Sequence, residues 1–303
     1  MQTAVFPGPK TAVCIQTAVS LPVSAVTFRW DGGLLVGNIG VMNIVVLIKQ
    51  VPDTWSERRL ADADNTLDRA SADVVLDEIN ERAVEEALLI KEREGGDSTV
   101  TVLTAGPERA TEAIRKALSM GADSAVHLTD EGLHGSCAVQ TAKALAKVIG
   151  TIGDVDLVIA GNEATDGTMG AIPAMVADVL GLPELTHARK VTVDGGTVTV
   201  ERETDDGVTV LQADLPAVVS VNEKINEPRY PSFKGIMAAK KKPVRTLSLA
   251  DAGIAGSDVG LAAATSTVID SAPRPPRSSG QVVTDEGDGA AQLVQYLITQ
   301  KLI

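Results

Sequence analysis

The stretch MNIVVLIKQVPD (residues 42–53) decides the fold. Ile44–Ile48 is an unbroken apolar run of strand length, which is typical of a strand buried on both faces of a parallel sheet. A polar turn, Lys49–Asp53, follows it directly. The same unit recurs along the chain, with an apolar strand, a polar turn and then a helix, so the stretch sets the pattern of the whole domain.

Helices and strands alternate from this point onward. The segment Asp77–Glu94 is predicted to be helical because Ile79, Ala83, Ala87 and Ile90 recur at helical spacing, and Gly95-Gly96 should end it. The further strands expected are Thr99–Leu103, Ser124–Leu128, Leu157–Ala160 and Ala217–Val221, and the further helices Pro107–Leu118, Ser136–Ile149 and Ala171–Leu180. Such alternation predicts an α/β fold with an open, mostly parallel sheet covered by helices on both faces.

The second half of the chain changes character. Short alternating segments at Val191–Val193, Val198–Glu203 and Val208–Leu211 are separated by DGG and DDG turns, which predicts antiparallel hairpins at a sheet edge. From Asp251 the composition turns to Ala, Gly, Ser and Pro, so residues 251–303 are predicted to be a linker and a C-terminal helix arm. The tail GAAQLVQYLITQKLI (289–303) has an apolar helix face with nothing of its own to dock on, so we expect this arm to dock on a partner subunit.

Composition and residue spacing exclude several classes of function. The 303 residues carry a formal net charge of −13, and a nucleic-acid binder would need a basic face instead. Residues 1–41 show no periodicity, so we expect a disordered leader outside a fold that spans residues 42–250. No apolar run is long enough to cross a membrane, and no His or Cys pair has metal-ligand spacing. Two distant cysteines, Cys14 and Cys137, favour a reducing, cytoplasmic location.

Catalytic signatures are missing from the sequence, including GxGxxG after the first strand, the GxxxxGK[ST] phosphate loop, GxSxG, HExxH and CxxC. We therefore expect no bond-breaking chemistry from this chain alone. Polar, Gly-rich turns do follow three strands, at 49–53, 104–107 and 161–170. In an open parallel sheet these turns meet at the carboxyl edge, where ligands bind, and free N–H groups at a helix start can hold a phosphate. The same pattern also suits ordinary loops, and on the pattern alone both interpretations stand.

Several segments in order resemble one family. VNEKINEPRYPSFKGIMAAKKKPV (221–244) resembles the signature of the electron transfer flavoprotein β subunit, and AIRKALSMGAD (113–123), DLVIAGNEATDG (156–167) and VERETDDGV (200–208) match in the same order. The resemblance implies an adenine-nucleotide-binding, Rossmann-like domain that pairs with an α subunit. It implies a structural AMP in this chain and an FAD held mostly by the α subunit. Electrons would come from acyl-CoA dehydrogenases, as in fatty acid oxidation, and pass to a membrane quinone oxidoreductase.

The resemblance also implies which residues bind the nucleotide. They are Leu47, Lys49, Asp77, Asn80 and Ala105, together with the loop Gly161, Asn162, Glu163, Ala164, Thr165, Asp166, Gly167, Thr168, Met169, Gly170, Ala171 and Ile172. Many family members have a Gln and a Thr near the end of this loop, where this chain has Thr168–Ile172. The backbone N–H groups of residues 167–171 would then have to carry the phosphate. Trp55 lies near a position where some relatives place a Tyr beside the flavin, and it is equally interpretable as an exposed loop residue.

The segment 226–243 stands out in an acidic chain because it is cationic and partly apolar. Pro231 can start a helix in which Phe233, Ile236 and Met237 share one face. By resemblance this is the recognition loop that docks in an apolar pocket of the dehydrogenase, with Tyr230, Phe233, Ile236 and Met237 as partner-binding residues. The alternative is a helix that packs on its own domain.

Three functions are candidates for this sequence. The first is the electron-transfer subunit with AMP and a shared FAD, or a bifurcating-type subunit with a second FAD in place of AMP. The second is a stand-alone adenine-nucleotide-binding protein of the same fold class. The third, an adenylating enzyme, would need an SGGxDS-type loop, and KQVPDTW (49–55) is not one.

Overall fold

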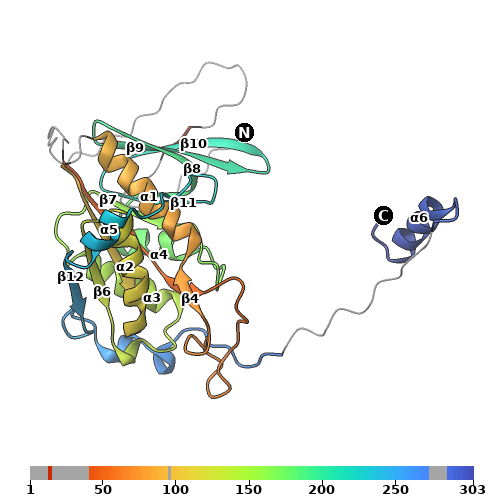
Figure 1. The fold of residues 1–303 in the computed structure, drawn as a ribbon, viewed down its shortest axis with the longest axis horizontal. Coiled ribbons are helices and arrows are strands. Elements are labelled where there is room, and N and C mark those ends of the chain that lie inside the picture. The colour runs from red at the N-terminus through yellow and green to blue at the C-terminus, as the bar shows by residue number, and fades with distance from the viewer. Residues whose placement is uncertain (1–12, 16–40, 95–96, 273–284) are drawn as a thin grey trace. The chain divides into compact units, whose positions relative to one another are not determined.

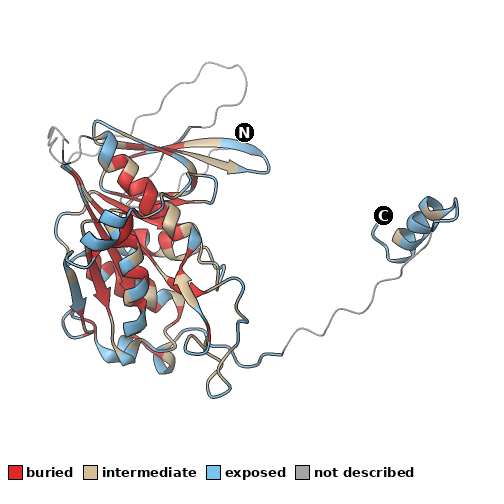
Figure 2. Ribbon diagram, viewed as in Figure 1, coloured by how far each residue is buried: buried red, intermediate tan, exposed pale blue. Residues whose placement is uncertain are grey.

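The computed structural model describes residues 13–15, 41–94, 97–272 and 285–303. These form two units, one ending at Ile269 and the other running from Asp270 to Ile303. The first unit holds the sheet, and most of its buried residues lie on the sheet strands and on the helix faces against them (Figures 1 and 2).

The sheet has ten strands in the order β1-β10-β9-β8-β11-β7-β2-β5-β6-β12. The parallel part comprises β2 (Asn43–Leu47), β5 (Thr99–Ala105), β6 (Ser124–Leu128), β7 (Leu157–Gly161), β8 (Glu184–Asp194), β11 (Ala217–Val221) and β12 (Val244–Leu247). The antiparallel edge comprises β9 (Thr197–Thr204), β10 (Gly207–Asp214) and β1 (Val13–Ile15). The predicted α/β class and the antiparallel edge are both confirmed.

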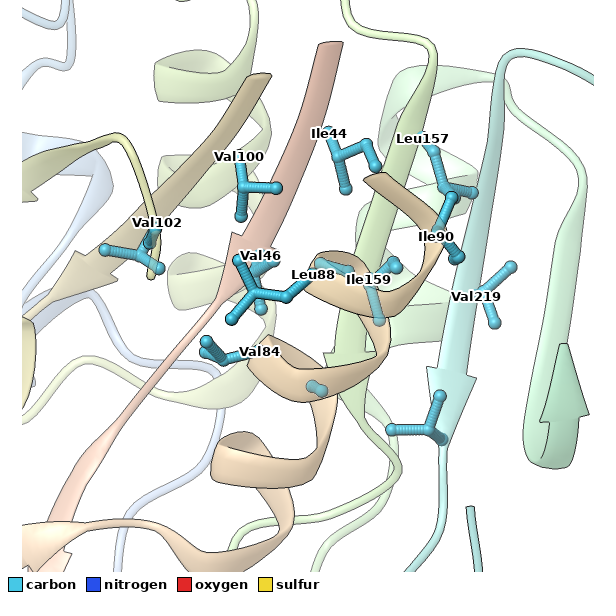
Figure 3. Close-up of a cluster of buried hydrophobic side chains, with 14 of the residues drawn as sticks. Ile44, Val46, Val84, Leu88, Ile90, Val100, Val102, Leu157, Ile159 and Val219 are labelled. Carbon is cyan, nitrogen blue, oxygen red and sulfur yellow. The ribbon is translucent and has the colours of Figure 1, made fainter. Parts of the chain in front are cut away.

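Alternate residues of the central strand β2 enter two separate cores. Ile44 and Val46 lie in a cluster with α1 (Glu78–Arg93) and α2 (Thr111–Met120), as Figure 3 shows for Val84 and Leu88 of α1. Val45 and Leu47 lie in a second cluster with α3 (Ala138–Ile149) and α4 (Ile172–Leu180). Both faces of the sheet are therefore covered by helices, which is why β2 reads as a continuous apolar run.

The predicted helix at Asp77–Glu94 is observed one residue shorter at each end. Asp77 is the N-cap, and its carboxylate accepts from the N–H groups of Ile79 and Asn80. Glu94 is the C-cap, while Gly95 and Gly96 lie outside the described residues. A capping carboxylate satisfies amides that the helix itself leaves unbonded.

Three expectations need correction. Val13–Ile15 pairs with β10, so these three residues do not lie outside the fold, whereas most of the predicted leader lies outside the described residues. The linker does not begin at Asp251, because Ala252, Ile254 and Val259 are buried in the second core cluster. The Ala, Gly and Ser residues around them give this segment the composition of a linker, although the segment packs on the core. A two-stranded ribbon of β3 (Gln50–Pro52) and β4 (Val74–Leu76) was not predicted at all.

Among its described residues, the second unit contains one helix, α6 (Gly289–Thr299). None of its residues is buried, and Leu293, Tyr296 and Ile298 are about half exposed. The predicted apolar helix is therefore present, and within its own unit its apolar residues are not packed into a core.

Candidate functional site

The predicted ligand site lies where the order of the sheet reverses. The chain moves from β2 to β5 and β6 on one side, then returns to β7 and β11 on the other side of β2. The carboxyl ends of β2 and β7 thus form a topological switch point, the usual position of a ligand in such sheets. Leu47 ends β2 and Gly161 ends β7, and the loop 162–171 follows Gly161.

Asp77 joins this loop to the start of α1. One of its carboxylate oxygens caps α1, and the other accepts from the N–H of Thr165 at 2.7 Å and from its hydroxyl at 2.8 Å. Asn80, one turn into α1, accepts from the N–H of Lys49 at 2.7 Å. Two predicted site residues therefore hold the loops that follow β2 and β7 in one fixed arrangement.

Asp166 is the second link between these loops. Its side chain is 2% exposed and accepts from Lys49 Nζ at 2.7 Å and from Arg69 Nη2 at 3.1 Å. Burial alone would raise the pKa of this carboxyl, but Lys49 and Arg69 outweigh burial and lower the pKa below its ordinary value. Lys49 therefore forms an ion pair with Asp166, and the sequence pattern did not predict this pairing.

The end of the loop offers unbonded amides at the start of α4. Among the described residues, the N–H groups of Gly167, Met169, Gly170 and Ala171 donate to no protein acceptor. Thr168 is different, because its N–H donates to Ala164 O at 2.8 Å. Ala171 caps the helix without a side-chain hydrogen bond. Four free amides beside a helix start suit an anion such as a phosphate, so the residues present fit the implied nucleotide.

The beginning of the loop is tightly packed. A Cβ at Gly161 would lie 2.5 Å from Asn80 Nδ2 and 3.0 Å from Ile79 Cγ2, so any larger residue would displace these side chains at the start of α1. The Oδ1 atom of the next residue, Asn162, is buried and has no hydrogen-bond partner among the described residues. An orphaned buried acceptor costs free energy unless something donates to it, which is a second indication of a bound ligand.

The structure brings most of the predicted site residues together. Lys49, Asp77, Asn80 and the loop 161–172 form one bonded cluster, and Leu47 lies beneath it in the core. Ala105 ends β5, which lies on the side of β2 away from β7. Arg58 and Arg69 were missed. Arg58 donates to Thr165 O at 2.7 Å across 107 residues, and no local sequence signal indicates such a contact.

The predicted docking segment forms a short helix, α5 (Phe233–Ala239), whose N-cap Ser232 accepts from Gly235 N. Tyr230 is 95% exposed and Phe233 79%, and Ile236 and Met237 are about half exposed. The opposite side of α5 packs on α2, where a Cβ at Gly235 would lie 2.5 Å from Ser119 O. The apolar face therefore points away from its own domain, which disfavours the alternative of a packing helix.

Trp55 is 96% exposed. A cavity of about 250 Å³ lies beside Glu78, Arg82 and Pro228, away from the free amides. In the part of the chain that the structure describes, no cluster of His, Cys, Asp and Glu is arranged to hold a metal, and no helix is long and apolar enough to span a bilayer.

Comparisons with known proteins agree with this geometry. Residues 64–252 match the model of the electron transfer flavoprotein domain. The electron transfer flavoprotein β subunits of Mycobacterium tuberculosis and Mycobacterium leprae are each 67% identical over 264 residues, which is 86% of this chain and 99% of theirs.

More distant relatives cover the same share of the chain. The β subunit of Thermoanaerobacterium thermosaccharolyticum is 37% identical, and a subunit of the caffeyl-CoA reductase–Etf complex of Acetobacterium woodii is 33% identical. The chain therefore belongs to the electron transfer flavoprotein β-subunit family, which places it in flavoprotein electron transport and implies an α subunit as its partner.

Proposed function

We propose that this chain is the β subunit of an electron transfer flavoprotein that binds a structural AMP and helps its α subunit enclose an FAD. The complex shuttles electrons from acyl-CoA dehydrogenases to a membrane quinone oxidoreductase. The observation that supports the nucleotide most directly is the set of four free amides before α4, beside the buried and unpartnered Asn162 Oδ1. FAD supplies the redox chemistry when bound, and this chain supplies binding and docking.

The role of the AMP is architectural in this proposal. Gly167–Ala171 would hold its phosphate, and the loop that carries them is fixed through Asp77 and Asp166 to α1 and to the segment after β2. A phosphate neutralised by helix amides would stabilise this arrangement, and so would stabilise the heterodimer. No residue of the loop has to take part in electron transfer.

Docking of the donor would use the exposed apolar face of α5. Phe233, Ile236 and Met237 offer a small, protruding apolar surface, with Tyr230 beside it. An aromatic anchor that enters a pocket and excludes water is the usual form of a binding hot spot. Three exposed lysines beside it, Lys234, Lys240 and Lys241, would steer an acidic dehydrogenase surface.

Coexpression with the α subunit from the same organism tests the proposal. We expect a purified heterodimer with a flavin absorbance spectrum, one FAD and one AMP per dimer after denaturation and chromatography, and reduction of the flavin by an acyl-CoA dehydrogenase and its substrate. Two FAD and no AMP would favour the bifurcating-type subunit. A nucleotide-bound chain that forms no flavin-containing complex would favour the stand-alone binding protein.

A further inference from the structure

One guanidinium fixes the beginning of the docking segment. Arg229, directly before Tyr230, donates from Nε to Glu85 at 2.7 Å and from Nη2 to the other Glu85 oxygen at 3.0 Å. Its Nη1 donates to Glu92 at 2.6 Å, and its backbone N–H also reaches Glu85 at 3.1 Å. Both glutamates belong to α1 and lie about two turns apart, so a single side chain ties the segment to two positions along that helix.

A second residue repeats the connection three positions earlier. Asn226 donates from Nδ2 to Arg82 O at 3.1 Å and to Glu86 at 3.1 Å, while Arg82 donates to Asn226 O. The side chains of Glu85 and Glu86 are 6% and 4% exposed, which is rare for glutamate unless it is paired. Helix α1 therefore carries two buried acidic side chains that bond the residues before the docking helix.

The far end of the segment is held on α2. Arg115 donates to Ala239 O at 2.8 Å, and Lys242 donates to Leu118 O and Ala122 O, at the C-terminus of α2. The cation at this helix end is favoured by the unbonded carbonyls and by the helix dipole. The ammonium group of Lys242 therefore stabilises the fold. Gly235, which lies between the two ends of the docking segment, is close against α2.

We propose that Arg229 is a positioning residue for the docking face. The hydrogen bonds from its guanidinium group to Glu85 and Glu92 hold the following residues, Tyr230 and Phe233, in the orientation that a dehydrogenase binds. This inference rests on the proposed docking function of α5. An exposed seven-residue helix is not stable by itself, so its geometry depends on these contacts. Fixing it before the partner arrives removes an ordering cost from the binding step.

The chemistry requires arginine. A lysine keeps the charge beside buried Glu85, yet its single ammonium cannot bridge two carboxylates in the planar, multidentate manner of a guanidinium. Arg229→Lys should therefore fold while leaving the docking segment loosely held. Loss of the charge, as in Arg229→Gln, would leave Glu85 buried and unpaired and destabilise the domain itself.

The test compares Arg229→Lys and Glu92→Gln with the matched control Arg189→Lys in the FAD-loaded heterodimer. Arg189 likewise pairs with two carboxylates, those of Glu201 and Glu203, and in the described part of the chain the docking segment contributes no bond to these three residues. We expect Arg229→Lys to raise the KM for the dehydrogenase by roughly tenfold, with kcat, flavin content and Tm nearly unchanged, and Glu92→Gln to raise it less. Arg189→Lys should leave KM unchanged.

A double-mutant cycle with Phe233→Ala separates positioning from general weakening. If Arg229 acts by orienting Phe233, Arg229→Lys should add little to the KM once Phe233 is an alanine. Full additivity, or a wild-type KM in Arg229→Lys, would overturn the inference while the docking role of α5 stands. If Phe233→Ala alone left KM unchanged, the docking function and this inference would both be wrong.

Discussion

The carboxylate of Asp77 accepts two hydrogen bonds from Thr165, at 2.7 Å from the N–H and 2.8 Å from the hydroxyl, across 88 residues of sequence. Asp77 also caps α1, so one buried side chain connects a helix start with the loop proposed to hold a phosphate. Changes in this loop should therefore affect both the stability of the fold and the retention of the nucleotide.

Thr165→Val tests the connection. The valine keeps the shape and the N–H but removes the hydroxyl that donates to Asp77, and hydrogen bonds to charged groups contribute more than neutral ones. We expect the free energy of unfolding to fall by about 1–2 kcal/mol, measured by urea denaturation. Thr192→Val, at an exposed strand position, is the control and should change little. Equal stability of the two variants would mean that the Asp77–Thr165 bond does not stabilise the loop.

Asp166 predicts a pH dependence. Its pKa is lowered in the folded protein, so its contribution to stability is present above its ordinary pKa of about 4 and is lost as the pH falls through the lowered value. Asp166→Asn should therefore destabilise the protein at pH 7, and its difference from wild type should shrink below about pH 4. Thermal unfolding of both proteins between pH 3 and pH 7 measures this, and a difference independent of pH would contradict it.

The two loop glycines separate ligand effects from backbone effects. A Cβ at Gly167 meets no atom within 4 Å, so Gly167→Val should fold normally but crowd the phosphate and reduce AMP per heterodimer. Gly170 has φ +67°, so Gly170→Val should also strain the backbone and lower Tm. Nucleotide content by chromatography and Tm are measured together. If electron transfer per assembled, FAD-loaded heterodimer also collapsed in Gly167→Val, a purely structural role of AMP would be refuted.

Local patterns predicted most of the helices and sheet strands, but they did not predict the long-range pairings between side chains. The apolar run Ile44–Ile48 and the helical spacing after Asp77 predicted β2 and α1 correctly, because burial on one or both faces leaves a periodic signature. The bond between Arg229 and Glu85 joins residues 144 positions apart, and Lys242 is satisfied by carbonyls of a distant helix. Charged residues in such roles look like surface residues in the sequence. The boundary after residue 250 was wrong for a related reason, since Ala and Gly serve both linkers and close packing.

Truncation after Asp288 tests the role of α6. It belongs to a unit separate from the one that holds the sheet, so its removal should leave the Tm of the sheet-containing unit unchanged. We propose that its apolar face docks on the α subunit. The truncated heterodimer should then dissociate at a higher concentration, because a buried apolar helix face is lost. Sedimentation of serially diluted heterodimer measures this. Identical dissociation of the full and truncated forms would refute docking by this helix.

The final prediction concerns Phe233, the most exposed apolar side chain of α5. Because 79% of its surface is exposed, Phe233→Ala should cost the fold little, whereas truncating a core Phe typically costs about 3–5 kcal/mol. In the complex with a dehydrogenase the same change should cost about 2 kcal/mol or more, as for a buried hot spot. Tm, AMP content and flavin content should stay near wild type, while the KM for the dehydrogenase rises. Ile269→Ala, which removes a 91% exposed side chain elsewhere, is the control and should alter neither quantity. A large fall in Tm with normal electron acceptance would make Phe233 a packing residue, and the docking function of α5 would be lost with it.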